Sequence, residues 1–353
     1  MRLQNIINKV SKEERITFDE ACFLYEDGDF YELGKLADEI RRKKHPNNIV
    51  TYVVDRNINY SNICVCGCKF CAFYRPPNDP SGYVITFEEL DKKIEETIQL
   101  GGTQILLQGS LHPDLKLDFY IEMLSHIKQK YPQIHIHGFS PPEIVHFSKI
   151  NNLSIEQILQ RLIDAGLDSI PGGGAEILVD RVRKEVSPNK CTADEWLYVM
   201  EIAHNLGLKT TATMMFGHRE TKKERILHLI KLRELQDKTK GFTAFIPWGF
   251  QPDNTRLKAR KVTSVEYLRT LAISRIVLDN FQNIQVSWVT MGSEIAQLAL
   301  FFGGNDFGST MIEENVVAAT GVKFRMSIEQ IRKHIKDAGF IPKQRKMDYT
   351  IIE

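Results

Sequence analysis

Four of the six cysteines in this chain lie within eight residues, in the segment Cys64-Val65-Cys66-Gly67-Cys68-Lys69-Phe70-Cys71. Within it, Cys64, Cys68 and Cys71 have the spacing Cys-x3-Cys-x2-Cys. Three thiolates on one short loop can bind three irons of a [4Fe–4S] cluster, whereas the ordinary cluster site supplies four thiolates. The spacing therefore predicts an iron–sulfur site whose fourth iron can bind a further ligand.

Other uses of these cysteines fit less well. A disulfide framework is typical of small secreted chains, but this chain is large enough to bury a core and nothing at its N-terminus resembles a signal peptide. A structural zinc site usually joins two ligand pairs, and no second Cys-x2-Cys or spaced histidine pair follows. Cys66 is either a bystander or an alternative cluster ligand. Cys22 and Cys191 lie in helical surroundings, where a free thiol usually acts as a small buried hydrophobe.

Length and composition limit the classes of protein. A chain of 353 residues with 42% apolar and 26% charged residues suits one large α/β barrel or two ordinary domains. A net charge of +1 gives no global attraction to nucleic acid or anionic lipid. No apolar run approaches the roughly 20 residues that span a bilayer. We expect a soluble protein without nucleic-acid partner or membrane insertion, located in a reducing cytoplasm because thiolates must hold a cluster.

The elements that must position the loop alternate between apolar strands and amphipathic helices, the pattern of a (β/α)8 TIM-type barrel. Helical periodicity covers segments such as 86–100, 154–165, 192–206, 222–236 and 264–280. The eight expected strands span 49–55, 103–108, 134–139, 167–170, 209–215, 241–248, 284–288 and 306–310.

We divide the chain into a helical N-terminal extension (1–47), the barrel (48–312) and a helical C-terminal extension packed on the barrel (313–353). The segment 327–338 is the helix expected in the last of these. The only loop-rich stretch, 74–82, follows the cysteines and is either a lid or a surface turn.

In a barrel, the loops that leave the C-terminal ends of the strands build the active site. The cysteine loop leaves the first expected strand. Polar and glycine-rich groups follow four others, in the segments 108–113, 135–143, 170–176 and 211–220. His135 and His137 alternate with isoleucines and so share one face of their strand. They are either hydrogen-bonded core residues or substrate contacts, and either could accept a proton near physiological pH.

The cysteine spacing resembles that of the radical S-adenosylmethionine (SAM) superfamily. From Val54 to Met311 the chain is also similar to the dehypoxanthine futalosine cyclase (cyclic dehypoxanthinyl futalosine synthase) family. That similarity is carried jointly by the segments 135–143, 172–182, 212–218 and 242–251. It implies a radical SAM barrel with a [4Fe–4S] cluster, SAM on the fourth iron, a place in the futalosine route to menaquinone, and a flavodoxin- or ferredoxin-type reductant.

The resemblance also implies a reaction. A 5′-deoxyadenosyl radical takes the ribose C4′ hydrogen of dehypoxanthine futalosine, the carbon radical attacks the benzoate ring, and loss of an electron and a proton leaves a cyclic product. Such a radical requires a closed pocket, so positioning should dominate catalysis.

Further roles follow from the resemblance. Phe70 would lie against the adenine. Gln108 and Gly109 would hold the SAM amino group, unless they only end a strand. Thr213 and Met215 lie in a segment that matches the fifth-strand SAM motif, with threonine in place of its first glycine, and Met215 could equally be core.

Substrate residues are less defined. Glu176, after three glycines, would accept hydrogen bonds from sugar hydroxyls or would merely complement a helix N-terminus. Candidates for the benzoate carboxylate are Arg56, Arg183 and His218, each of which could instead form a structural ion pair. Acidic candidates for sugar hydroxyls, or for a solvated rim, are Asp306, Glu313 and Glu314.

Two other functions remain open. Aminofutalosine synthase, which adds the adenosyl radical to an enolpyruvyl double bond, belongs to the same pathway, but the segments 134–143 and 172–182 favour the cyclase. A non-catalytic iron–sulfur electron carrier would need only the cysteine loop and would leave the polar strand ends unexplained.

Overall fold

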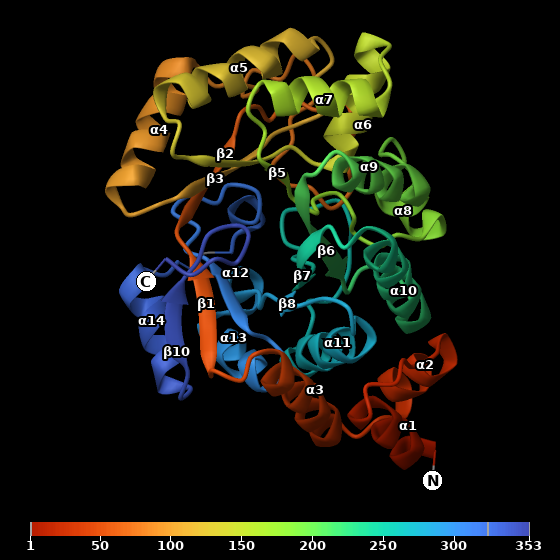
Figure 1. The fold of residues 1–353 in the computed structure, drawn as a ribbon. Coiled ribbons are helices and arrows are strands. Elements are labelled where there is room, and N and C mark those ends of the chain that lie inside the picture. Colours follow the sequence, from red (N-terminus) through yellow and green to blue (C-terminus); the bar gives the residue numbers. More distant parts are fainter. Residues whose placement is uncertain (1, 323–324, 353) are drawn as a thin grey trace.

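The computed structural model describes residues 2–322 and 325–352; residues 1, 323, 324 and 353, which belong to the two expected extensions, lie outside this range. A ring of parallel strands is surrounded by helices (Figure 1). The strands are β1 (Ile49–Val53), β2 (Asp55–Asn59), β3 (Gln104–Gln108), β4 (His135–Gly138), β5 (Ser169–Ile170), β6 (Lys209–Phe216), β7 (Phe242–Gly249), β8 (Asn283–Ile284), β9 (Asp306–Ser309) and β10 (Ile341–Gln344).

Two hydrogen-bonded sheets close into one barrel. Strands β2 to β8 form a parallel sheet in chain order, and β10, β1 and β9 form a second sheet with β1 in the middle. A bridge between Gln285 and Asp306 joins β8 to β9. On the other side, the N–H groups of Thr310 and Ile312 donate to the carbonyls of Val53 and Asp55. Because β1 and β2 thus act as one bent strand, the eight-stranded barrel predicted from the sequence is confirmed.

Three expected strands have different bounds. The strand expected at 49–55 is interrupted between β1 and β2. The strand expected at 167–170 contains only Ser169–Ile170, and the one expected at 284–288 ends at Ile284. Beyond β8, hydrogen bonds to and from side chains take the place of backbone bonds between strands. Ser287 N donates to the Tyr267 hydroxyl (2.7 Å), and the Trp288 indole donates to Ser309 O (2.9 Å). The chain therefore turns into a helix instead of extending the strand.

Most helices begin where a side chain satisfies the first free N–H groups. Six begin with a capping box, in which a Ser or Thr and a Glu or Gln three residues later bond each other's backbone. The helices are α1 (Arg2–Ser11), α2 (Phe18–Asp27), α3 (Phe30–Lys44), α4 (Phe87–Gln99), α5 (Leu117–Lys130), α6 (Pro141–Asn151), α7 (Ile155–Asp164), α8 (Asp180–Val186), α9 (Ala193–Asn205), α10 (Lys222–Thr239), α11 (Ser264–Val277), α12 (Trp288–Met291), α13 (Ser293–Ala299) and α14 (Ile328–Asp337).

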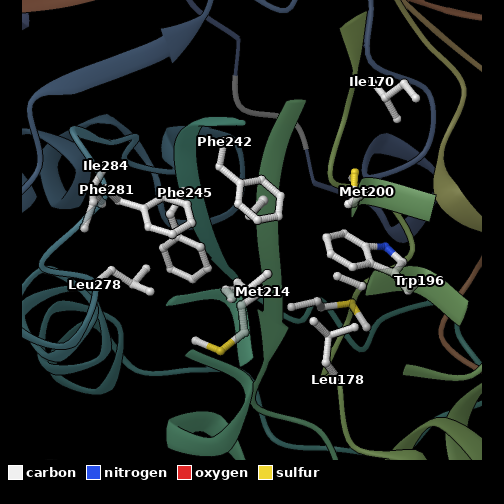
Figure 2. Packing of buried hydrophobic residues seen from close by; sticks show 14 of the residues in the cluster. Ile170, Leu178, Trp196, Met200, Met214, Phe242, Phe245, Leu278, Phe281 and Ile284 are labelled. Carbon is white, nitrogen blue, oxygen red and sulfur yellow. The ribbon is translucent and has the colours of Figure 1, made fainter. Parts of the chain in front are cut away.

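The main core lies between the strands and the helices. Figure 2 shows Met214 of β6 and Phe242 and Phe245 of β7 packed among side chains such as Trp196 and Met200 of α9. These aromatic and sulfur side chains are fully or almost fully buried and fix β6 and β7 against the helical layer. No helix among the described residues is long and apolar enough to cross a membrane.

Both chain ends pack on the barrel. Helix α3 packs against α11, and α2 packs against α10. Strand β10, which follows α14, lies parallel to β1 (Figure 1), with Ile341 opposite Ile49. The expectation of a wholly helical C-terminal segment is therefore wrong. The strand was missed because four residues that include Pro342 form too weak a pattern to recognise.

Candidate active site

The cysteine loop lies at the C-terminal ends of the strands. It follows β2, and the N–H of Val65 donates to Leu111 O, beyond β3 (3.0 Å). The N–H of Lys69 donates to Val186 O, at the end of α8 (2.9 Å). These contacts place the loop over the end of the barrel where an active site is expected.

The four thiols of this loop are free and close together. Cys66, Cys68 and Leu111 form a small buried cluster, against which Cys64, Phe70 and Cys71 pack. The Sγ atoms of Cys66 and Cys68 are 3.3 Å apart. This contact raises the pKa of Cys66, and it combines with a nearby ammonium group to lower the pKa of Cys68 to about 7.

The donor set fits the expected cofactor. Three thiols at the right spacing gather in one apolar cluster, and the thiols of Cys66 and Cys68 share a hydrogen bond. Thiolates are the ligands of iron–sulfur clusters, and three of them leave one iron open. Cys64, Cys68 and Cys71 would therefore hold a [4Fe–4S] cluster, with Phe70 beside it.

The ammonium group near Cys68 belongs to Lys190, which the sequence did not single out. Lys190 Nζ lies 2.9 Å from Glu176 Oε1 and 5.0 Å from the centre of the Phe70 ring. Although burial opposes the charged form, Cys68 and Glu176 hold the pKa of Lys190 well above its usual value. Lys190 thus connects the cysteine loop to the wall of the barrel.

Glu176 occupies a constrained position on that wall. Its backbone has a left-handed conformation (φ 40°), and its Oε2 lies 3.5 Å from Arg183 Nη1. Arg183 also donates to the carbonyls of Ala175 (2.7 Å) and Cys191 (2.7 and 2.9 Å). Glu176 is therefore held between two cations, and Arg183 shapes the glycine loop.

A cavity of about 280 Å³ lies inside the barrel. Its floor is formed by Asp55, Gln104 and Ser309 together with the C-terminal residues Arg345, Met347 and Tyr349. Its wall includes Asn57, Leu106, Gln108, His137, Thr211, Thr213 and Ile246. At the C-terminal ends of the strands it is lined by Gly173, Gly174, Glu176, Trp248, Trp288, Met311, Glu314, Val316 and Val317.

Because Glu176 lines this cavity and also pairs with Lys190, the cavity adjoins the cysteine loop. The loop at 74–82 does not contribute to the cavity wall within the described part of the chain. Instead, Arg75 Nε donates to Ser81 Oγ (2.8 Å) and ties that loop to itself.

Gln108 and Gly109 lie beside the cavity at the end of β3. Gln108 lines it, and the N–H of Gly109 donates to Glu143 Oε1 (3.1 Å), which also accepts from the Tyr60 hydroxyl (2.6 Å). A Cβ atom at residue 109 would lie 2.4 Å from the Tyr60 ring, so only glycine fits. Glu143, within a segment that supports the resemblance, thus fixes the backbone at the expected SAM site.

Thr213 and Met215 differ in position. Thr213 lines the cavity and donates its hydroxyl to Gly172 O (2.6 Å). Met215 is buried and outside the cavity lining, although its N–H donates to Glu176 O (3.1 Å). In the same motif, Glu220 accepts from Gly217 N (2.6 Å) and pairs with Arg225 (2.7 Å), which makes it a support for the loop.

The two histidines of β4 lie on one face, as expected, because both contact the Ser169 hydroxyl at 2.7 Å. His137 lines the cavity. His135 is the first residue of β4 and lies instead in a pocket at the N-terminal end of the barrel, beside Asp348. Burial lowers the pKa of His135, and that of His137 falls well below its usual value. Both histidines therefore favour the neutral form more than a free histidine does.

The candidates for the benzoate carboxylate are engaged elsewhere. Arg56 pairs with Glu96 (2.8 Å), and Arg183 binds backbone carbonyls. The His218 ring lies 3.0 Å from Met215 O and 3.2 Å from Glu220. Since none of the three lines the cavity, the structure favours the structural alternative for each.

The acidic candidates are also held by partners. Asp306 is fully buried and bonds Arg345 and Thr51, so it is not part of a solvated rim. Glu313 pairs with Lys93 (2.6 Å). Glu314 lines the cavity and accepts from the N–H groups of Val317 and Ala318, and burial raises its pKa.

A second cavity, of about 340 Å³, shares part of this lining. Both cavities are lined by Trp288, Val289, Met311, Glu314 and Val317, and Arg325 contributes a cation to the second. Arg325 has no ion-pair partner within the described ranges. Arg325 was not identified from the sequence, because an isolated arginine in a loop carries no pattern.

Two family models match the chain. One describes the radical SAM superfamily and covers residues 58–232, and the other describes the CofH/MqnC C-terminal region and covers residues 239–353. Among solved structures, the FeFe-hydrogenase maturase HydG from Carboxydothermus hydrogenoformans is similar, with a TM-score of 0.79, 18% identity and coverage of 98% of this chain and 80% of that one. Methylornithine synthase has a TM-score of 0.72 at 17% identity, with coverage of 96% and 97%. These two structures support the fold.

Curated relatives are much more similar in sequence. A cyclic dehypoxanthine futalosine synthase from Halalkalibacterium halodurans is 46% identical over 100% of this chain and 95% of its own. One from Streptomyces coelicolor is 45% identical over 98% and 88%. A 5-amino-6-(D-ribitylamino)uracil–L-tyrosine 4-hydroxyphenyl transferase from Methanocaldococcus jannaschii is 42% identical over 97% and 98%. With its three-cysteine loop beside a barrel cavity, the chain belongs to the radical SAM enzyme family of the cyclic dehypoxanthine futalosine synthases.

Proposed function

We propose that this enzyme converts dehypoxanthine futalosine to cyclic dehypoxanthine futalosine. The observation that carries the proposal is the position of Glu176, which lines the barrel cavity and pairs at 2.9 Å with Lys190, beside the cluster cysteines. A radical formed at the loop would therefore arise next to the barrel cavity. The identity of 46% over the whole chain to a synthase of this name supports the same reaction.

Cofactor binding divides among several elements. We assign the cluster to Cys64, Cys68 and Cys71. When bound, the cluster and SAM supply a 5′-deoxyadenosyl radical that removes the ribose C4′ hydrogen. The residues assigned to SAM are Phe70 and the backbone near Thr213 and Met215 for adenine, Gln108 and Gly109 for the amino group, and Lys190 for the carboxylate.

Glu176 acts mainly through Lys190 in this assignment. Its two oxygens face Lys190 and Arg183, so it holds the ammonium in place more readily than it accepts from a sugar hydroxyl. A fixed ammonium group is ready to receive a carboxylate without reorganisation.

The substrate is an aromatic acid joined to a sugar, and the cavity offers a place for each part. We place the benzoate against Trp288, Val289 and Met311, with its carboxylate toward Arg325 of the second cavity. Aromatic and apolar walls suit the ring, and a guanidinium group suits a carboxylate. The sugar would then lie among the polar side chains deeper in the barrel.

Two residues of the cavity are suited to bind the sugar and to accept the proton. His137 is neutral and engages Ser169 with Nδ1, which leaves its other ring nitrogen for a sugar hydroxyl. Burial raises the pKa of Glu314, which makes this carboxylate a better proton acceptor near neutral pH. We therefore assign the proton lost on rearomatisation to Glu314 in place of a histidine, and we omit His135 because it lies outside the cavity.

The partners of the reaction follow from its electron balance. Reductive cleavage of SAM takes one electron, which we assign to a flavodoxin- or ferredoxin-type protein. Rearomatisation releases one electron, which we assign to the oxidised form of the same protein. An iron–sulfur cluster with an open iron is best preserved in a reducing compartment, and we place the enzyme in the cytoplasm.

The test is anaerobic incubation of reconstituted, reduced enzyme with SAM and dehypoxanthine futalosine, followed by mass spectrometry. We expect substrate-dependent 5′-deoxyadenosine and a product two hydrogens lighter than the substrate. Parallel reactions would contain tyrosine with 5-amino-6-(D-ribitylamino)uracil, because the transferase relative is 42% identical. A product only in that mixture, or an adenosyl adduct only with enolpyruvyl benzoate, would overturn the proposal in favour of the transferase or of aminofutalosine synthase. SAM cleavage without any of these three products would also contradict the proposed reaction.

A further inference from the structure

One surface segment beside the cysteine loop is strongly basic. Between β7 and α11, the sequence Arg256-Leu257-Lys258-Ala259-Arg260-Lys261 carries four cations in six residues, although the whole chain has a net charge of only +1. All four cationic residues are exposed, whereas Leu257 is buried and anchors the segment. Such a concentration of one charge creates a local positive field.

This segment touches the cysteine loop directly. The guanidinium group of Arg256 donates to Gly67 O (2.5 Å) and to Cys68 O (3.3 Å), and the N–H of Arg256 donates to Lys69 O (2.9 Å). The Arg256 guanidinium also lies 5.3 Å from the centre of the Tyr74 ring. A protein bound on the segment would therefore lie against the backbone that carries the cluster ligands.

The charges of this surface are not compensated. Within residues 2–322 and 325–352, no carboxylate pairs with Lys69, Arg256, Lys258, Arg260 or Lys261. Some other exposed cations do have such partners: Arg181 lies 2.6 Å from Glu224, and Lys238 lies 2.5 Å from Glu201. Five uncompensated cations around one loop favour an anionic partner at this place.

We propose that this basic surface, formed by Lys69, Arg256, Lys258, Arg260 and Lys261, is the docking site of an acidic one-electron donor protein. The inference rests on the proposed function only in requiring an external electron. One electron passes from the reduced flavin or iron–sulfur centre of the partner to the cluster, so the partner is oxidised and the cluster is reduced. Charge complementarity speeds the encounter, and docking on the loop shortens the path of the electron.

The experiment uses holoenzyme carrying Lys258→Glu, Arg260→Glu and Lys261→Glu, none of which contacts the cavity or the cysteines. Binding of an acidic flavodoxin and of an acidic ferredoxin is measured by biolayer interferometry at several salt concentrations. We expect about tenfold or greater weakening at low salt, together with loss of the salt dependence seen for the unmodified enzyme. The milder Lys258→Gln, Arg260→Gln, Lys261→Gln variant should fall between the two.

A matched control reverses three exposed cations that lie on α3, on α14 and after α1: Lys35→Glu, Lys336→Glu and Lys12→Glu. It should bind both donors like the unmodified enzyme. Formation of 5′-deoxyadenosine driven by dithionite should be equal in all variants, which shows that they are folded and active. Equal donor affinity of the triple reversal and the unmodified enzyme would overturn the inference, as would lack of binding by the unmodified enzyme. Failure of dithionite to support any SAM cleavage would instead contradict the proposed function.

Discussion

The two ends of the barrel place their charged groups in different surroundings. At the N-terminal ends of the strands, two buried carboxylates are held by neighbouring side chains: Asp306 binds Arg345 and Thr51, and Asp55 accepts from Gln104 (2.7 Å) and from Ser309. At the C-terminal ends, Glu176 is also paired, at 2.9 Å with Lys190, but this pair lies between the cavity and the free thiols of the cysteine loop. Buried groups that only satisfy one another hold a structure together, whereas charged groups beside a cavity and free thiols can also bind a ligand.

The first three predictions test this difference between the two ends, and the fourth concerns a buried group away from both. The first concerns the cysteine loop, where we expect the largest effect. Cys68→Ser removes a cluster ligand and should abolish both the iron–sulfur absorbance and SAM cleavage. Cys66→Ser should keep both, because Cys66 lies outside the Cys-x3-Cys-x2-Cys spacing. Iron content, visible absorbance and 5′-deoxyadenosine would be measured after reconstitution of each variant. Loss of the cluster in Cys66→Ser would show that the ligand assignment is wrong.

The second prediction concerns the opposite end, where we expect loss of stability. Arg345→Met leaves the buried Asp306 carboxylate without its cation and should lower the free energy of unfolding by about 3–5 kcal/mol. Chemical denaturation of the purified protein measures this. Arg345→Met combined with Asp306→Asn should recover part of the loss, because the isolated charge is gone. A cost of about 1 kcal/mol or less, as for a surface pair, would show that this end is not held by the buried ion pair.

The third prediction tests the proposed carboxylate contact in the second cavity. Arg325→Gln removes a charged partner worth about 1.5–3 kcal/mol and should raise the KM for dehypoxanthine futalosine roughly 10- to 100-fold. SAM binding and protein stability should change little, because Arg325 is exposed. Lys336→Gln, an exposed site on α14, is the matched control. An unchanged KM in Arg325→Gln would remove Arg325 from the substrate site.

The fourth prediction concerns acid stability and a buried group outside both ends. His228 of α10 is fully buried, and burial lowers its pKa to about 3. The folded protein therefore disfavours the proton that the unfolded chain takes up near pH 6.5, so stability is complete above pH 6.5 and falls as the pH drops toward 3. Each pH unit should cost up to about 1.4 kcal/mol from this residue.

Denaturation at pH 7, 6 and 5 measures that slope. In His228→Gln the protein should be less stable at pH 7, since Leu178 N loses its acceptor, but the slope should be smaller. An identical slope in both proteins would contradict the assignment of the acid sensitivity to His228.

Much of the fold could be predicted from the sequence, because the patterns that indicate helices and strands are local. Strand and helix alternation gave the barrel, and helix bounds agreed closely, since capping residues such as Thr86, Ser154 and Thr192 stand at the starts of α4, α7 and α9. The predicted strands at β5 and β8 were too long, because buried apolar residues also lie beyond the hydrogen-bonded part of each strand.

The residues of the site could be predicted only where they belong to a sequence motif. The cysteine spacing identified the loop, and the strand-end segments identified Gln108, Thr213 and Glu176 as cavity residues. Lys190 and Arg325 were missed because single cations in loops form no pattern, and only the fold brings them to the cavities. His135 was misplaced because it shares one face of β4 with His137, although it is the first residue of the strand and so lies at the N-terminal end of the barrel.

The central claim is that a radical made at the cysteine loop reaches a substrate held in the adjoining cavity. The most direct measurement uses dehypoxanthine futalosine with deuterium at C4′ and follows the 5′-deoxyadenosine that is formed. We expect that the 5′-deoxyadenosine gains one deuterium and that the cyclic product lacks it. Unlabelled 5′-deoxyadenosine, formed while the product keeps its deuterium, would contradict the account.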